Sequence, residues 1–539
     1  MKVCLLYRDK DWNDIKKYSD DRNIVTDLGL QTLFTESAKE VVWDKEGRVK
    51  KLLPVDAFIQ RTMRSVVMVP LLTPREIIYR QEILADAVKE EAFMRSLYVF
   101  STEVLKKWGI LGRRLETKSR GTRDSKGRLV TDIETLRHLV HSLSQLKEMF
   151  KVEIENLKSE GFRELYHRLC EEFSDEKEAA LTKTLDSVSF YAPAEESMGE
   201  EMIGRPRMVL GCDLTEGLKC GNLILEEMET QMKKYRNPKS MLSKMQGYIN
   251  SLTPDSIIIQ KSMQITEQAA ELEYEVVRHV INSCKPFEDF VGAYFDQLKF
   301  QIGFYLGAVN LGQQMKRFGV KYCYPKVVEK ENLRFTELKE FVMCMEQRVE
   351  PVGNTCDIND RMMVIVTGAN QGGKSTFLRS VAIAQIMMQC GLFVPAERYE
   401  SAIFPSFFTH FTRREDSQMN SGRLDEELQR MNQIIENLDK DSVVMLNESF
   451  ATTTEKEGSV IAYDITKALV EAGVKVLTVT HLLSYAQKVY AEAHDDPETT
   501  VEFLSAERLP DGRRTFRMVQ HEPELTSFGM DLYEELIGV

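Results

Sequence analysis

One short loop constrains this chain more than any other feature. The β-branched run at 365–367 leads into Gly-Ala-Asn-Gln-Gly-Gly-Lys-Ser-Thr at 368–376, and a helical pattern continues to Gly391. A G-x-x-x-x-G-K-[ST] pattern that follows a strand and opens a helix is the context that a phosphate-binding loop requires. The sequence therefore predicts a nucleoside triphosphate site at this loop.

The residue types of the loop suit phosphate and Mg²⁺. Its glycines let backbone N–H groups turn inward around the β- and γ-phosphates, and the helix that follows directs its positive dipole end at the same groups. Lys374 adds a point charge, and the Ser375 hydroxyl is a ligand for Mg²⁺. The predicted ATP-binding residues of the loop are Gly368, Asn370, Gly372, Gly373, Lys374, Ser375 and Thr376.

Two further apolar runs end in polar residues. The run at 442–446 ends in Asn447-Glu448, where a P-loop ATPase has an Asp that holds Mg²⁺ through water and a Glu that polarises the attacking water. Glu448 is therefore the predicted general base. Asn447 is the predicted metal partner, but an amide carries no charge, which predicts weaker Mg²⁺ binding and slow hydrolysis. The run at 476–480 ends in His481, a predicted γ-phosphate sensor, although a core histidine is the usual alternative.

Composition excludes several classes of protein. The chain has 539 residues and a formal net charge of −13, which argues against a surface that coats nucleic acid throughout. Its nine cysteines are scattered singly without zinc spacing, which is typical of reduced thiols in an intracellular protein. No stretch approaches the apolar length of a membrane span, so we expect a cytoplasmic protein without a membrane partner.

The pattern changes along the chain predict its organisation. We expect a small mixed segment at 1–60, a helical domain at 61–325 with a clamp-like insertion at about 180–265, and an α/β domain at 326–539. Pro74 followed by Glu76 predicts a helix start. An apolar stripe between Ile133 and Leu157, interrupted only at Lys147, predicts a long packed helix.

A basic, glycine-interleaved segment runs from Lys106 to Arg128, where only Glu116 and Asp124 oppose the positive charges. It is expected to be an irregular loop. One interpretation is a solvated loop, and the other is a contact to the phosphate backbone of DNA.

Together, these elements resemble the MutS family of DNA mismatch-repair ATPases. The stretch ending in Val394-Pro395-Ala396, Thr480-His481 at a strand end and Ser527-Phe528-Gly529 are similar to segments of its ATPase domain. The segment around Ser421-Gly422-Arg423 is similar to the element that ABC-type ATPases insert into a partner's active site. The resemblance implies a multidomain fold, in which a mainly α helical core or lever domain precedes an ABC-type P-loop α/β ATPase domain. It also implies a homodimer through the ATPase domains, with Ser421 and Gly422 contributing to nucleotide binding.

Departures from the family pattern are equally specific. No module comparable to the family's N-terminal mismatch-reading domain is evident, so the chain is expected to be a shortened MutS-like protein. Phe450-Ala451-Thr452 stands where the family has a Gly-Arg-Gly-like loop, and Val352 stands where an adenine-stacking aromatic residue is common. Leu424 and Asp425 replace a Ser-Thr-like run after Arg423, which leaves the role of the serine in trans open.

Three functions are compatible with this pattern. The leading expectation is an ATPase that uses ATP and Mg²⁺ to couple nucleotide state to helical levers, which bind mismatched or branched DNA. The alternative is an ATP-dependent scaffold or switch that acts on a protein partner without DNA. A third hypothesis, based on Asn447, is an ATP-dependent clamp that does not hydrolyse.

Overall fold

The structure is a computed structural model, and most of the chain is described by it. The described residues are 2–8, 18, 21–118, 125–187, 203–215, 219–233, 263–328, 332–412, 422–494, 500–509 and 511–523. The chain divides into two compact units that interleave along the sequence. Unit 1 comprises Met1–Val3, Ser96–Asn156 and Arg163–Lys299, and unit 2 comprises Cys4–Arg95, Leu157–Phe162 and Phe300–Val539. The expected division at residues 60 and 325 stays a prediction.

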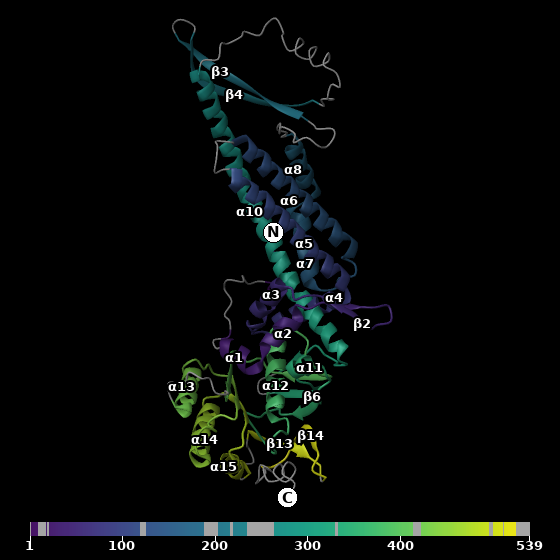
Figure 1. Cartoon of the computed structure of the whole chain (residues 1–539), viewed down its shortest axis with the longest axis vertical. Coiled ribbons are helices and arrows are strands. Elements are labelled where there is room, and N and C mark those ends of the chain that lie inside the picture. The colour runs from purple at the N-terminus through teal and green to yellow at the C-terminus, as the bar shows by residue number, and fades with distance from the viewer. Residues whose placement is uncertain are drawn as a thin grey trace. The chain divides into compact units, whose positions relative to one another are not determined.

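Unit 1 consists mainly of long helices and one antiparallel strand pair (Figure 1). Its elements include all or part of α5 (Glu91–Lys118), α6 (Ser125–Glu153), α7 (Glu160–Glu172), α8 (Asp175–Ser187), β3 (Ile203–Thr215), β4 (Lys219–Lys233) and α10 (Met263–Arg317). On α6, Ile133, Val140 and Phe150 are buried, as the apolar stripe predicts.

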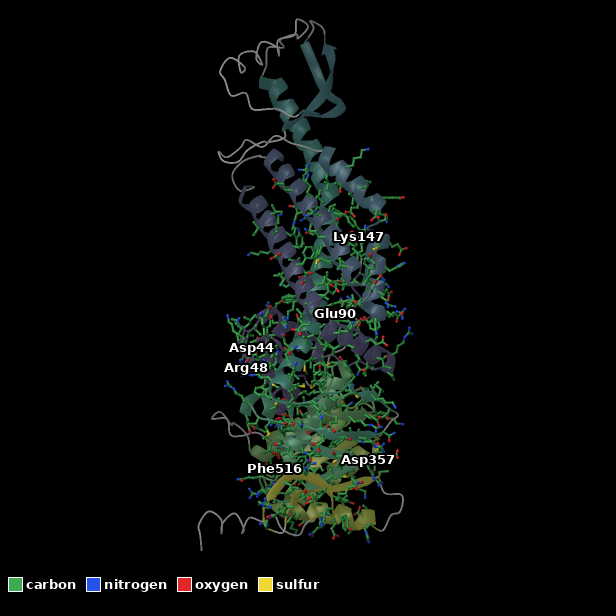
Figure 2. All side chains as sticks on the ribbon, turned by 90° about the vertical axis from the view of Figure 1, so that its right-hand side faces the viewer. Asp44, Arg48, Glu90, Lys147, Asp357 and Phe516 are labelled. Carbon is green, nitrogen blue, oxygen red and sulfur yellow. The ribbon has the colours of Figure 1, made fainter. Side chains whose placement is uncertain are left out.

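Lys147 interrupts that stripe without leaving the core. Its side chain is buried on α6, among the helices of Figure 2. The Nζ atom donates hydrogen bonds to Asp175 and, at 3.2 Å, to Glu178, both in the first turn of α8. Burial would lower the pKa of Lys147, but the two carboxylates outweigh burial and raise it. A charge inside an apolar stripe is therefore compensated by a partner helix.

The segment Lys106–Arg128 corrects one expectation, because most of it is helical rather than a loop. The α5 helix extends to Lys118, and α6 begins at Ser125, while 119–124 lie outside the described residues. Gly109 lies inside α5, and no atom of the described residues is within 4 Å of a Cβ built there. No close approach therefore requires glycine at this position, and its low helix propensity destabilises the helix by about 1 kcal/mol relative to alanine. Long helices tolerate that cost when they pack elsewhere along their length.

Unit 2 begins with short elements that precede the α/β domain in sequence. These are α1 (Asp21–Leu28), α2 (Leu30–Ser37), β1 (Val41–Trp43), β2 (Val49–Leu52), α3 (Ala57–Val67) and α4 (Pro74–Lys89). The start of α4 is as predicted: Thr73 is the N-cap, its hydroxyl accepts from Glu76 N at 3.3 Å and donates to the Glu76 carboxylate at 2.8 Å. This reciprocal pair satisfies a backbone donor that the helix start leaves unbonded.

The α/β part of unit 2 carries a six-stranded sheet in the order β10-β11-β12-β8-β13-β14. Every neighbouring pair is parallel except β13-β14. The strands are β8 (Met363–Thr367), β10 (Phe407–Phe411), β11 (Val443–Asn447), β12 (Lys475–Val479), β13 (Val501–Arg508) and β14 (Arg514–Gln520). The parallel sheet confirms the α/β expectation in its coarse form, a multidomain chain with a helical part and an α/β part.

Helices and a small second sheet complete this unit. The helices are α11 (Phe341–Gln347), α12 (Lys374–Gln389), α13 (Arg423–Glu436), α14 (Glu455–Glu471) and α15 (Leu483–His494). The second sheet has the order β5-β9-β6-β7, formed by β5 (Lys326–Val327), β6 (Leu333–Leu338), β7 (Asn354–Asp357) and β9 (Arg398–Ser401). Met363 and Ile365 of β8 join one apolar core with residues of α13, α14 and α15. Val364 and Val366 are also buried, and strand alternation places them on the opposite face.

Candidate nucleotide-binding site

The loop between β8 and α12 has the backbone conformation of a tight phosphate-binding turn. Gly368 and Gly373 have φ values of 105° and 91°, and Gln371 adopts 59°. A Cβ at Gly368 would come within 2.8 Å of both Ala506 N and the Ser505 hydroxyl on β13. Glycine at 368 is thus required both by its conformation and by the close approach of β13.

Lys374 is buried at the first position of α12. Its Nζ atom donates hydrogen bonds of 2.9 Å to the carbonyl oxygens of Gly368 and Ala369. Only 5% of its surface is exposed, so these carbonyls compensate part of the charge within the loop. Phosphate oxygens are stronger partners for an ammonium group than carbonyls, because they carry negative charge.

A cavity of ≈410 Å³ opens beside this loop. Six of the predicted loop residues line it together with Glu448: Asn370, Gly372, Gly373, Lys374, Ser375 and Thr376. Gly368 contributes its carbonyl to Lys374 rather than lining the cavity. A hollow of ≈420 Å³ in unit 1 has a mostly apolar lining, with five aromatic or leucine side chains at Leu143, Phe173, Leu181, Phe287 and Phe290. The loop cavity has more convergent polar groups and is therefore the better candidate for a ligand site.

The end of β11 places Glu448 and Asn447 in different environments. Glu448 lines the cavity and has a left-handed backbone, with φ of 54°. Asn447 does not line it, and its Oδ1 atom is buried without a hydrogen-bond partner among the described residues. Burying an amide oxygen unbonded costs about 1–3 kcal/mol.

The orphaned amide oxygen allows a test of whether Mg²⁺ fits. The donor set is the Ser375 hydroxyl, which lines the cavity, and Asn447 Oδ1, which has an unused lone pair at the strand end. Mg²⁺ usually keeps several waters and takes few protein oxygens, so these two oxygens with nucleotide phosphates suit it. No group of three or more His, Cys, Asp or Glu that could hold a metal occurs among the described residues.

The turn after Glu448 contains a second left-handed residue, Phe450, with φ of 64°. Non-glycine residues in this region cost about 1–2 kcal/mol each. The Phe450 side chain is fully buried, and its N–H donates to the Glu427 carboxylate of α13 at 2.9 Å. The Thr412 hydroxyl, just after β10, donates to the Glu448 carbonyl at 2.7 Å. The strained turn is therefore held from both sides by its neighbours.

His481 follows β12 and lies outside the cavity. It is exposed in this structure, and the preceding residue, Thr480, is bonded through its N–H to Val366 O on β8 at 3.1 Å. Glu455 at the start of α14 accepts hydrogen bonds of 3.0 Å from both the backbone N–H and the hydroxyl of Ser484. These bonds, with a smaller contribution from His481, hold the pKa of Glu455 below its ordinary value. The predicted sensor role of His481 stays a prediction.

The element expected to act in trans is described only in part. Ser421 lies outside the described residues, whereas Gly422 is the N-cap of α13 and is exposed. Among the described residues, no atom lies within 4 Å of a Cβ built at Gly422, and Gly422 is not one of the residues that line the loop cavity. The exposed start of a helix is a suitable anion site.

Sequence reasoning missed Phe516, which lines the cavity from β14 and is labelled in Figure 2. It is 47% exposed and has a left-handed φ of 60°. Asn354 of β7 fixes the backbone on either side: its Nδ2 donates to Phe516 O at 3.4 Å, and its Oδ1 accepts from Met518 N at 2.7 Å. Val352 lines the same cavity. An aromatic ring does stand beside the loop, although not at position 352.

Another residue that lines the cavity, Glu340, is bonded to the helix that follows the phosphate-binding loop. Glu340, the N-cap of α11, lines the cavity and accepts a hydrogen bond of 3.1 Å from Arg379 on α12. Burial raises the pKa of Glu340, and Arg379 opposes that effect.

No helix in the described part of the chain is long and apolar enough to cross a membrane.

Comparisons with known proteins match two parts of the chain to models of MutS domains. The model of MutS domain V matches residues 364–535, which include the loop, β11, β12 and β14, and that of the MutS2 N-terminal domain matches residues 73–318. A DNA mismatch repair protein MutS of Thermotoga petrophila is 29% identical over 224 residues, 41% of this chain and 27% of that protein. A DNA mismatch repair protein MSH3 of Debaryomyces hansenii is 26% identical over 277 residues, 49% of this chain and 27% of that protein.

A third relative matches a shorter stretch. The MutS protein homolog 4 of Mus musculus is 33% identical over 135 residues, 25% of this chain and 14% of that protein. The aligned stretches thus span about a quarter or less of these relatives' lengths.

Proposed function

The chain belongs to the MutS family, and from that premise we propose that it binds and hydrolyses ATP with Mg²⁺ at the 368–376 loop. The observation that carries the proposal is that the loop and Glu448 line one cavity. A phosphate cradle and a carboxylate in reach of the same space are the two parts that phosphoryl transfer to water requires.

Each residue has a separate role in the proposed reaction. Backbone N–H groups of the loop and Lys374 bind the β- and γ-phosphates, and the charge of Lys374 offsets the charge that develops as the bond between the γ-phosphorus and the bridging oxygen breaks. Glu448 orients the attacking water and accepts its proton, and His481 is the proposed γ-phosphate sensor. Ser375 and Asn447 would hold Mg²⁺, which would supply positive charge that offsets the charge of the phosphates.

Two copies of the chain are proposed to complete each site. Gly422 is exposed at the start of α13 and is not one of the residues that line the cavity of its own chain. The backbone N–H groups at the start of α13 could therefore contact a nucleotide bound to a second copy. This geometry favours a homodimer through the ATPase domains, with Ser421 beside Gly422 in the same role.

DNA is the proposed partner of the helical part. The support is the family membership, the similarity to relatives that are DNA mismatch repair proteins, and the basic residues of 106–128. Of these residues, Lys106 and Lys107 are exposed on α5. The rival function, an ATP-dependent switch that acts on a protein partner, is favoured by the net charge of −13.

One experiment separates these functions. The ATPase rate and DNA affinity are measured with duplex, mismatched and branched DNA, at low and high salt, with Lys374→Ala as the blank. The proposal expects turnover above the blank and salt-dependent binding of at least one DNA. If all three DNAs fail to bind at low salt with ATP present, the DNA part is wrong. If Glu448→Gln leaves turnover unchanged, the hydrolysis part is wrong.

A further inference from the structure

A cluster of buried polar groups adjoins the turn that carries Glu448, and the proposed chemistry does not use it. Its centre is His410 on β10, which has no exposed surface. The ring Nδ1 atom lies 2.7 Å from the Ser449 hydroxyl, and Nε2 lies 3.1 Å from the carbonyl oxygen of Glu427 on α13. A single side chain thus bridges the strand, the turn and the helix.

The acceptors fix how the ring is bonded. A carbonyl oxygen only accepts, so Nε2 carries a hydrogen and donates it to Glu427 O. The Ser449 hydroxyl donates to the His410 carbonyl oxygen at 2.8 Å, and its oxygen also lies 2.7 Å from Nδ1. Each ring nitrogen thus has a polar partner, and neither of these side-chain contacts survives replacement by an apolar side chain.

Helix α13 is also hydrogen-bonded to the turn after Glu448 and to strand β10 through other residues. The Glu427 carboxylate accepts from Phe450 N at 2.9 Å, and the Phe450 ring stacks on His410 with centroids 5.6 Å apart. One turn of α13 further on, Arg430 donates to the carbonyl oxygen of Phe411 at 2.9 Å. The position of α13 and the conformation of the turn are consequently linked.

We infer that His410 is a positioning residue for Glu448, and that it links the orientation of this carboxylate to α13. Glu448 and Phe450 both have left-handed backbones, so the turn keeps its shape only while its neighbours hold it. Ser449, between them, is bonded to His410. The helix fixed at the other end of this bridge is the one whose N-cap, Gly422, does not line the cavity of its own chain. The inference rests on the proposed ATP hydrolysis.

Three substitutions at His410 separate its two bonds. His410→Phe keeps a ring that stacks on Phe450 and removes both hydrogen bonds. His410→Asn keeps a polar group near Nδ1, facing Ser449, and His410→Gln keeps one near Nε2, facing Glu427 O. Steady-state ATPase kinetics and the equilibrium affinity for a non-hydrolysable ATP analogue with Mg²⁺ are measured on the full chain.

We expect kcat of His410→Phe to fall about 10-fold or more, because small misplacements of a catalytic group are costly, with nucleotide affinity within about twofold of wild type. His410→Asn should retain more of kcat than His410→Gln, since it retains the bond toward Ser449. The matched control is Thr466→Val on α14, which also removes buried hydrogen bonds. These run from Thr466 Oγ1 to Ala462 O at 2.7 Å and from the Tyr485 hydroxyl to Thr466 Oγ1 at 3.1 Å, and neither involves a residue of the turn.

Two results would overturn the inference alone. One is kcat within twofold of wild type in all three variants. The other is a parallel loss of kcat and nucleotide affinity that matches the fraction unfolded, as followed by circular dichroism, because that would mean a purely structural role. If the wild-type chain binds the analogue but hydrolyses no ATP, the proposed hydrolysis fails and the inference fails with it.

Discussion

The Lys374 ammonium group donates a 2.9 Å hydrogen bond to the carbonyl oxygen of Gly368, six residues back in the same loop. This bond, with its counterpart to Ala369, holds the lysine inside the loop while the cavity beside it stays open. Phosphate binding has to replace carbonyl partners with phosphate oxygens, a favourable exchange for a cation.

Replacing Lys374 by Met should therefore affect binding more than folding. Met keeps the apolar stem but loses the charge, and a hydrogen bond to a charged group contributes about 1.5–3 kcal/mol, so we expect ATP affinity to fall about 10- to 100-fold. Affinity is measured by calorimetric titration with Mg²⁺ present. Lys467→Met on α14, a half-exposed lysine bonded to Tyr463, is the control. Equal affinities of Lys374→Met and wild type would contradict the role of Lys374.

Asn447→Asp should exchange stability for metal affinity. The orphaned amide oxygen becomes a buried carboxylate, which without a compensating cation costs more than the roughly 1–3 kcal/mol of an unbonded neutral group. We expect a lower thermal midpoint without Mg²⁺, and a lower Mg²⁺ concentration for half-maximal ATPase rate. Thermal melts with and without Mg²⁺-ATP, together with Mg²⁺ titrations of turnover, check both effects. An unchanged Mg²⁺ titration would mean that Asn447 has no part in metal binding.

Substitutions of Phe516 test whether its ring contacts the base of the nucleotide. They also distinguish the effect of the ring from that of its left-handed backbone. Both Phe516→Ala and Phe516→Gly remove the ring, and we expect each to weaken ATP binding about 5- to 10-fold, as losing an aromatic contact of about 1–1.5 kcal/mol predicts. Only glycine relieves the left-handed φ of 60°, so Phe516→Gly should be about 1 kcal/mol more stable than Phe516→Ala.

The measurements for Phe516 are nucleotide titrations and urea unfolding. Val519→Ala, on the same strand and 36% exposed, is the matched control because it lies outside the cavity. If inorganic triphosphate loses as much affinity as ATP in Phe516→Ala, the ring acts on the loop rather than on the base.

The local parts of the site could be predicted because their signals are contiguous in sequence. The loop at 368–376 combines glycine spacing, a strand and a helix, and the apolar runs before Asn447 and His481 are buried parallel strands. The glycine spacing reflects the backbone conformation that the loop requires. The continuous apolar runs reflect strands that are buried on both faces of a sheet, and both patterns can be recognised in the sequence. The parallel sheet brings the loop and Glu448 to one cavity, whereas Asn447 and His481, at the ends of neighbouring strands, do not line it.

The parts that could not be predicted depend on contacts between distant segments. Asp27 on α1 accepts a hydrogen bond from Thr409 on β10 at 2.8 Å, across 382 positions, and no local pattern announces that pairing. Phe516 reaches the cavity only because β14 returns antiparallel beside β13. The segment 106–128 contains the end of α5 and the start of α6, and its glycines made a loop the expected structure. Their unfavourable helix propensity is outweighed by the remaining residues of each helix.

The hydrogen bonds of Glu455 predict a pH-dependent local stability near His481. The folded-state pKa of Glu455 lies below the ordinary 4.5, chiefly because Ser484 N and its hydroxyl stabilise the carboxylate. A depressed carboxyl pKa contributes stability that is fully present above the unfolded-state pKa and is lost as pH falls through the folded-state pKa. Glu455→Gln should therefore open the start of α15 more readily at pH 7 and match wild type in strong acid.

Hydrogen exchange of the backbone around 482–487 measures this opening directly, and it avoids averaging over both units of the chain. After correction for the intrinsic pH dependence of exchange, we expect faster exchange in Glu455→Gln at pH 7, with the difference shrinking below pH 4.5. Glu471→Gln at the other end of the same helix is the control, since its carboxylate does not bond to Ser484. A difference in exchange rate that persists unchanged below the folded-state pKa would contradict this prediction. It would show that the size or packing of Glu455, rather than its charge, stabilises the contact between α14 and the segment that follows His481.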